Sequence, residues 1–202
     1  MTRNVFHFDP SDVDLPAAAS LPAAMGVGAR ALHVEVGFGK DVRTLRTAER
    51  EPDAMFLGVE ISRKKCRKFC EKVARAGLRN VRCYWGDARK VVGEMLPADS
   101  VDSFTILFPD PWPKRKHHKH RWIQADTAAL LVRALKSEGQ IVTATDHDGY
   151  RDQIREVLAG AGMTEVETRT EVPDDDRSLF AERFERIGES VTWMRWTTTS
   201  SG

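Results

Sequence analysis

Long apolar runs are missing from this sequence, and cysteine is scarce. No stretch of the 202 residues approaches the roughly 20 apolar residues that a membrane-spanning helix needs. The N-terminal stretch MTRNVFHFDPSDVDLP contains acidic residues and lacks the apolar core of a signal peptide, so we do not expect secretion. Three cysteines, an odd and sparse set, argue against a disulfide framework and predict reduced thiols in a cytoplasmic protein.

The few cysteines also argue against a metal centre. Cys66 and Cys70 lie four positions apart, which is one helical turn. Two thiolates alone make a poor metal site, and no histidine lies nearby to complete one. We therefore interpret the cysteines as structural and predict no metal.

An excess of charge of one sign is also lacking. The chain has 31 basic and 30 acidic residues and a net charge of +1, so it is not a polycation. Any binding of nucleic acid must then depend on a local cluster of charge. Such a cluster is present, because residues 114–121 are all Lys, Arg or His, whereas acidic residues concentrate elsewhere, for example at 174–176.

Short apolar runs alternate with amphipathic stretches over most of the chain. Residues 1–30 lack clear periodicity and are interpreted as an N-terminal arm, and residues 31–202 as a single domain. The alternation predicts an α/β fold with a parallel sheet covered by helices on both faces. The predicted strands are 31–36, 55–60, 80–86, 101–108, 140–146, 163–169 and 190–197, and the predicted helices are 42–51, 62–77, 88–96, 122–139 and 149–162.

Ligands of open α/β sheets bind beyond the carboxyl ends of the strands, where this sequence has unusual residues. Gly37 and Gly39, in EVGFG after the first strand, allow a tight turn and close approach to a ligand. The dinucleotide fingerprint GxGxxG is incomplete, because Val42 stands at its last position. Glu60 lies 23 residues after Gly37, where a carboxylate accepts hydrogen bonds from ribose hydroxyls. A plain turn and an ordinary exposed acid are the alternatives.

Asp87, after the third strand, is placed to accept from an adenine amino group or to cap the next helix. A glycine turn without a complete phosphate cradle, a ribose acid and an adenine-side acid together suggest a nucleoside cofactor that lacks phosphates. S-adenosylmethionine (SAM) fits this description. Its cation also tolerates the nearby acids Glu35 and Asp41, which would repel a pyrophosphate.

The fourth predicted strand leads into FPDPWPKRKHHKHR, residues 108–121. Pro109 and Pro111 fix the backbone on either side of Asp110, so that its carboxylate is presented rigidly beside the reactive centre. Trp112 is placed to stack on a base or to line a pocket, and the cationic run offers charge to phosphates. A solvated basic loop is the alternative.

Asp146 follows the fifth strand and is expected to face the same crevice as Asp110. A purine presents donors on its Watson–Crick edge, for which two carboxylates are suitable acceptors. His147 beside it is a candidate base, although a lone histidine in a loop is more often simply solvated.

The segments EVGFG, FLGVEIS, GDA, FPDPWPKRKHHKHR and TATD resemble, in order and spacing, those of bacterial tRNA (guanine-N7)-methyltransferases over residues 31–160. The resemblance implies a Rossmann-like SAM-dependent methyltransferase fold with a mostly parallel seven-stranded sheet. It also implies transfer of a methyl group from SAM to N7 of guanine at variable-loop position 46 of tRNA. The implied cofactor contacts are Glu35, Gly37, Gly39, Glu60, Asp87 and Asp110, with Asp110 also catalytic. The implied substrate contacts are Lys114, Asp146 and Glu185, and the implied RNA contacts are Arg115, Lys116, Lys119 and Arg121.

The chain departs from this family at two places. Asp41 stands where the glycine loop usually has a third glycine, and residues 182–185 read Glu-Arg-Phe-Glu where many members have Thr-Lys-Phe-Glu. Two alternatives to a tRNA methyltransferase therefore stay open: a paralogue that methylates a small purine-like heterocycle, and an RNA-binding module without catalysis. Residues 177–189 are interpreted either as a lid on the substrate side or as plain packing. A monomer and a homodimer are equally compatible with the sequence.

Overall fold

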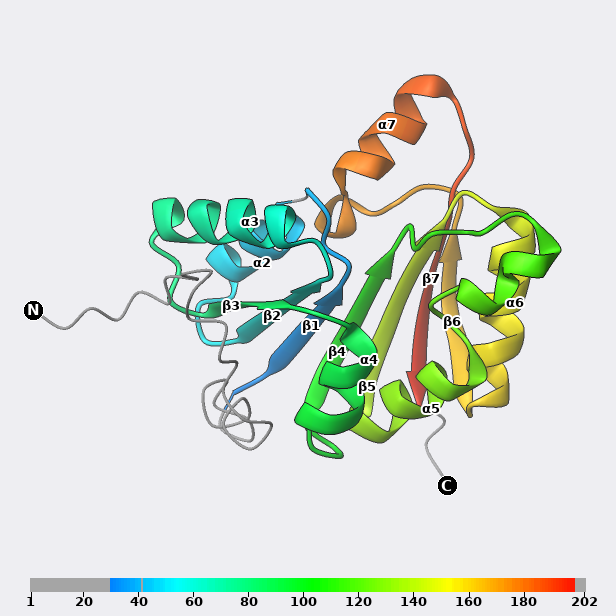
Figure 1. Cartoon of the computed structure of the whole chain (residues 1–202), viewed down its shortest axis with the longest axis horizontal. Coiled ribbons are helices and arrows are strands. Elements are labelled where there is room, and N and C mark those ends of the chain that lie inside the picture. The colour runs from blue at the N-terminus through cyan, green and yellow to red at the C-terminus, as the bar shows by residue number, and fades with distance from the viewer. Residues whose placement is uncertain (1–29, 41, 199–202) are drawn as a thin grey trace, which may run out of the picture.

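The computed structural model describes residues 30–40 and 42–198, which form a seven-stranded sheet with helices packed on it (Figure 1). The strand order is β3-β2-β1-β4-β5-β7-β6, and only β7 runs antiparallel to its neighbours, β5 and β6. The predicted α/β fold with a mostly parallel sheet is confirmed. The strands are β1 (Leu32–Val36), β2 (Met55–Glu60), β3 (Val81–Trp85), β4 (Val101–Leu107), β5 (Leu135–Thr145), β6 (Met163–Arg169) and β7 (Thr192–Thr198).

Helices lie on both faces of this sheet, while α7 projects beyond the carboxyl ends of the parallel strands (Figure 1). On one face α2 and α3 bury Leu45 and Phe69 against β2, and on the other α5 and α6 bury Leu131 and Ile154. The α-helices are α2 (Arg43–Arg50), α3 (Arg63–Ala76), α4 (Ala88–Lys90), α5 (Ala125–Ala134), α6 (Asp148–Gly160) and α7 (Leu179–Ile187); a π-helical turn η1 (Val91–Met95) and the 3-10 helices η2 (Arg115–His120) and η3 (Asp174–Asp176) complete the set in the described residues.

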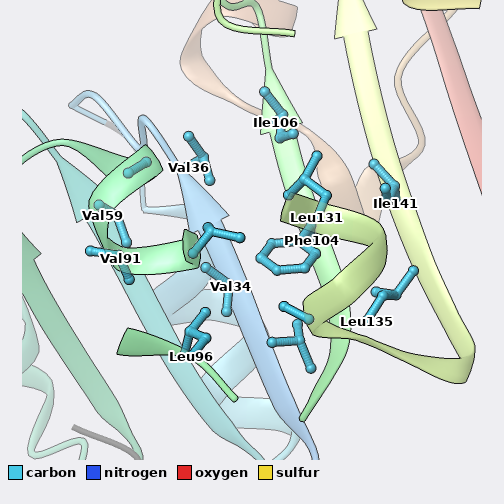
Figure 2. Packing of buried hydrophobic residues seen from close by; sticks show 14 of the residues in the cluster. Val34, Val36, Val59, Val91, Leu96, Phe104, Ile106, Leu131, Leu135 and Ile141 are labelled. Atoms are coloured by element: carbon cyan, nitrogen blue, oxygen red, sulfur yellow. The ribbon is translucent and has the colours of Figure 1, made fainter. Parts of the chain in front are cut away.

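The main core lies between the sheet and the α4–η1, α5 and α6 layer (Figure 2). Successive strand residues point to opposite faces, so Val34 and Val36 of β1 enter this core beside Phe104 and Ile106 of β4. Glu35, between the two valines, therefore faces the side of α2. This alternation decides which polar residues of β1 reach the candidate site.

Several predicted boundaries were wrong. The predicted helix 122–139 ends at Ala134, and β5 begins at Leu135, because Leu135 pairs with Val101 and the Lys136 ammonium lies 2.7 Å from the Asp102 carboxylate of β4. These contacts keep the segment in the sheet although its composition suits a helix. The predicted helix 88–96 is a short α4 followed by a π-helical turn.

The predicted N-terminal arm lies outside the described residues except for Arg30, and so does Asp41. In the part of the chain that the structure describes, no helix has the length and apolarity to cross a membrane.

Candidate functional site

The carboxyl ends of five parallel strands meet at one edge of the sheet. Val36 pairs with Val59, Glu60 with Trp85 and Leu107 with Ala144, so these strands end almost level with one another. The segments that follow β1 to β5 carry nearly all the predicted site residues. The edge is therefore the candidate functional site.

The glycine turn after β1 has the conformation that the sequence predicted. Gly37 and Gly39 have φ values of +74° and +63°, which side chains other than glycine rarely adopt. The Gly37 amide donates to the Val59 carbonyl at 2.7 Å, and the Gly39 amide donates to a Glu60 carboxylate oxygen at 3.1 Å. Phe38 between them is buried and stacks on Phe69 with ring centroids 4.2 Å apart. The turn is thus fixed to β2 by its backbone and to α3 by its side chain.

Glu60 is held in place by three donors. Besides the Gly39 amide, the Ser62 amide donates to it at 2.9 Å and the Lys65 ammonium at 3.3 Å. A carboxylate offers about four lone-pair sites, so acceptor capacity remains for a ligand hydroxyl. Its side chain is 5% exposed, which is compatible with a fixed acceptor at the base of a site.

Asp87 caps α4, since its carboxylate accepts from the Arg89 amide at 2.9 Å. The capping interpretation is confirmed, and the exposed position of Asp87 leaves the adenine-contact prediction open.

Sequence reasoning missed Ile61, which directly follows Glu60 and is 74% exposed. The Trp85 indole nitrogen donates to the Ile61 carbonyl at 2.9 Å and so fixes the backbone of Ile61 next to Glu60.

Glu35, a predicted cofactor contact, is buried and engaged by α2. Its carboxylate accepts from the Thr44 hydroxyl, and the Arg43 guanidinium lies 3.8 Å away. Arg43 also donates to Asp176 at 2.9 Å, and the other Asp176 oxygen accepts from the Trp193 indole nitrogen at 3.0 Å. Sequence reasoning missed this link, which ties the start of α2 to the segment before α7.

The motif after β4 contains two strained residues. Phe108 and Trp112 have positive φ values of 50° and 41°, which are uncommon for residues with a side chain. Phe108 also precedes a proline, which restricts its backbone further. Such strain persists only where the surroundings fix it, and it is concentrated at functional sites. Between the two, Asp110 is exposed, and Asp146 is exposed at the end of the neighbouring strand β5.

The basic run forms the short helix η2, a feature that the sequence did not predict. Lys114 precedes it, and its carbonyl accepts from the His117 amide at 2.7 Å. Trp112 lies against this helix, with ring centroids 5.7 Å from His117 and 5.2 Å from His120. The predicted RNA contacts in this run lie on the surface of η2: Arg115, Lys116 and Lys119.

The prediction that Arg121 contacts RNA is wrong for this conformation. Arg121 is 1% exposed, although it closes the most basic segment of the chain. Its guanidinium donates to the Pro111 and Gly149 carbonyls at 2.8 and 2.9 Å and to the Gln153 side chain at 2.8 Å. These partners turn the side chain inward, where a phosphate cannot reach it.

Residues 177–189 contain the helix α7, and Glu185, a predicted substrate contact, lies on it. The Glu185 carboxylate is 3.2 Å from the Arg177 guanidinium. On another side of α7, Phe180 and Phe184 approach Phe108 with ring centroids 6.0 and 5.2 Å apart. The helix therefore packs on the first residue of the motif after β4.

His147 is a helix cap in this structure. Its ring Nδ1 accepts from the Tyr150 amide at 3.2 Å at the start of α6. Tyr150 itself is buried, which raises the pKa of its phenol to about 12. The Nδ1 atom of His147 is therefore engaged in capping α6.

Comparison with known proteins agrees with the fold. The model of a family described as "Putative methyltransferase" matches residues 29–190, so the chain is a member of a methyltransferase family. More narrowly, the chain belongs to the tRNA (guanine-N(7)-)-methyltransferases. It is 36% identical over 164 residues to the protein of that name from Nitrosococcus oceani, an alignment that covers 81% of this chain and 70% of the relative.

Solved structures of more distant sequence share the fold. An antibiotic-related methyltransferase aligns with a TM-score of 0.65 at 21% identity over 91% of this chain and 94% of its own. A variant of a 16S rRNA (adenine(1408)-N(1))-methyltransferase from Catenulisporales acidiphilia, with its cosubstrate SAM, aligns with a TM-score of 0.63 at 17% identity over 94% of both chains.

Proposed function

We propose that this chain transfers a methyl group from SAM to N7 of guanine in tRNA, with the variable-loop guanine as its target. The observation that carries the proposal is the position of Asp110 and Asp146. The two acids follow neighbouring parallel strands, at the same edge of the sheet as the glycine turn, and the basic helix η2 begins five residues after Asp110. This arrangement supports an acceptor pair for a purine between the proposed nucleoside site and a cationic surface.

The cofactor side fits SAM by the chemistry of its residues. Glu60 keeps acceptor capacity for a ribose hydroxyl, and Ile61 offers an exposed apolar surface to an adenine ring. A side-chain carbon built on Gly37 would meet no atom within 4 Å, so the turn is open to a ligand. When bound, SAM supplies an electrophilic methyl group on a sulfonium.

The residues of this chain would contribute alignment, not proton transfer. Guanine N7 has a lone pair and no proton, so its attack requires no strong general base. Correct orientation of the reacting groups can contribute about 7–11 kcal/mol to such a reaction. Asp110 and Asp146 would accept from the N1 and N2 donors of the guanine. The charge of Asp110 would also stabilise the positive charge that develops on the base.

Lys114 and the surface of η2 would hold the RNA. Lys114 is exposed at the start of η2 and would bind a phosphate or the guanine carbonyl. Arg115, Lys116 and Lys119 are exposed next to it and would contact phosphates. Such contacts release counterions, so tRNA affinity should fall steeply with salt.

The proposal is tested with unmodified tRNA and labelled SAM, followed by mapping of 7-methylguanine by mass spectrometry. We expect one methylated guanine in the variable loop and none when that base is 7-deazaguanine, which lacks the nucleophilic nitrogen. Equal transfer to free guanosine would instead support the small-heterocycle alternative. Binding of tRNA without calorimetric SAM binding would support the non-catalytic alternative.

Asp110→Asn tests the assigned acid. It removes the charge and one acceptor site, and we expect kcat to fall by about 100-fold or more. The matched control is Asp53→Asn, an exposed acid just before β2 and therefore at the opposite edge of the sheet. Near-parent rates for Asp110→Asn, with an unchanged melting temperature, would refute the role of Asp110.

A further inference from the structure

Arg121 is a buried cation whose hydrogen-bond partners are all neutral. Its guanidinium lies over the Tyr150 ring, 4.8 Å from the ring centroid, and donates to two backbone carbonyls and one amide side chain. No carboxylate lies within ion-pair distance of it among the described residues, and burial lowers the pKa of the guanidinium. Burial of a cation without a counter-charge is costly, and here only hydrogen bonds and the Tyr150 ring offset that cost.

The hydrogen bonds of Arg121 join the two segments that carry the proposed acids. Pro111, whose carbonyl accepts at 2.8 Å, is the residue after Asp110. Gly149, whose carbonyl accepts at 2.9 Å, lies three residues after Asp146 in the first turn of α6. One planar guanidinium therefore bridges the loop after β4 and the loop after β5. A rigid fork of donors is suited to this, whereas a lysine is not.

Neighbouring contacts strengthen the bridge. The Tyr150 hydroxyl accepts from the Ile123 amide at 3.0 Å, and the Gln153 side chain donates to the Ile123 carbonyl at 2.9 Å. At its other end, the motif is held to β5 by the Phe108 amide, which donates to the Ala144 carbonyl at 2.8 Å. The loop that presents Asp110 is thus fastened at both ends to β5 and α6.

We propose that Arg121 is a positioning residue that sets the placement of the Asp110 carboxylate relative to that of Asp146. The proposal rests on the proposed function, because it assigns both acids to the guanine. It explains why the final arginine of a basic run is turned inward. Small misplacements of groups that align reactants can lower a rate by about 100-fold, so the bridge acts on kcat.

Arg121→Met tests the proposal, because it keeps the apolar stem and removes all three hydrogen bonds. Arg133→Met is the matched control: Arg133 also donates to backbone carbonyls, among them Leu96 at 2.8 Å, but near the start of β4 and away from the site. We expect Arg121→Met to lower kcat by about 10- to 100-fold. The KM for SAM should change less than kcat, since the glycine turn follows β1 and Glu60 ends β2. We expect Arg133→Met to lower the melting temperature and leave kcat near the parent value.

Two further measurements separate positioning from an RNA contact and from a purely structural role. The slope of log Kd for tRNA against log salt should be unchanged in Arg121→Met, whereas loss of a phosphate contact would reduce it by about 0.7–0.9. Amide hydrogen exchange should increase in residues 108–121 and 147–153 of the variant and not elsewhere in the sheet. An unchanged kcat in the folded variant, or a reduced salt slope, would overturn the proposal.

Two milder variants keep the proposal testable if Arg121→Met does not fold. Arg121→Lys retains the charge and can reach one carbonyl, so we expect kcat between those of the parent and the methionine variant. Gln153→Leu removes one of the three hydrogen bonds of Arg121, together with the one from Gln153 to the Ile123 carbonyl, and should lower kcat less than Arg121→Lys. Parent-like kcat in both would overturn the proposal. If the parent protein does not methylate guanine N7 but the exchange in 108–121 still increases in Arg121→Lys, the bridge stands and the proposed function fails.

Discussion

Gly58 in β2 is a position where one added methyl group should disturb the proposed cofactor side of the site. A side-chain carbon built there would lie 2.8 Å from Cδ1 and 3.1 Å from Cε1 of Phe38, and 3.5 Å from Cζ of Phe69. Carbon atoms do not approach to 2.8 Å without displacement. Phe38 is 3% exposed and stacked on Phe69, so its ring has no open space to enter. The turn that carries Phe38 must therefore move in Gly58→Ala.

The magnitude follows from overpacking of a buried contact. Extra methyl groups in packed cores destabilise by about 1–3 kcal/mol. In a chain of this length, each kcal/mol corresponds to about 2–4 °C, so Gly58→Ala should lower the melting temperature by about 2–12 °C. Movement of the turn also strains the hydrogen bond from the Gly39 amide to Glu60. A hydrogen bond contributes about 0.5–1.5 kcal/mol, so SAM affinity should fall by about two- to tenfold.

The assay is thermal unfolding together with SAM titration calorimetry, with two companion variants. Gly160→Ala is the matched control, because a side-chain carbon at this residue of α6 would meet no atom within 4 Å; it should be neutral or stabilising by up to about 1 kcal/mol. Phe38→Leu shortens the obstructing ring. A double-mutant cycle of Gly58→Ala with Phe38→Leu should therefore show coupling of about 0.5 kcal/mol or more. Parent-like melting of Gly58→Ala and zero coupling would refute the reasoning.

Three further predictions concern charge and thiol chemistry. Replacing Arg115 or Lys119 with alanine should lower the slope of log Kd for tRNA against log salt by about 0.7–0.9 each; an unchanged slope would remove that side chain from the interface. Burial lowers the pKa of His33 below 6.5, so the folded state favours the neutral ring. The contribution of the neutral His33 ring to the stability of the folded state is fully present above about pH 6.5 and is lost as the pH falls through the lowered pKa. Replacement by glutamine (His33→Gln) should therefore flatten the decline in melting temperature on acidification. An unaltered dependence of the melting temperature on pH would contradict this prediction. A hydrogen bond from Cys83 lowers the pKa of Cys70, so iodoacetamide should modify Cys70 first, and peptide mapping that finds Cys83 first would contradict it.

The sequence predicted those parts of the molecule that depend on local pattern. The seven strands are apolar or alternating runs, and the parallel order of β1 to β5 brings their carboxyl ends to one edge of the sheet. Gly37, Gly39 and Glu60 could be expected to lie together because the pairing of β1 with β2 brings the end of one strand beside the end of the other. The amide of Gly39 then meets the Glu60 carboxylate at 3.1 Å.

The residues that the sequence missed depend on long-range partners. Arg121 ends a run of eight basic residues, and nothing in that run distinguishes it from its exposed neighbours; its partners Gly149 and Gln153 lie 28 and 32 positions away. Arg43 likewise suits an exposed helix, yet its partner Asp176 is 133 positions away. The sequence pattern gives the composition of a surface, whereas such contacts depend on which loops the fold brings together.

In residues 182–185, the positions that differ from the motif of the bacterial enzymes and the positions that match it have different surroundings in the structure. Of residues 182–185, the first two differ from the common Thr-Lys-Phe-Glu, and both Glu182 and Arg183 are exposed. The matching residues are those with partners, because Phe184 packs on Phe108 and Glu185 pairs with Arg177. The changes therefore leave the attachment of α7 to the motif after β4 intact. What they alter is the exposed surface of α7, on which both Glu182 and Arg183 lie.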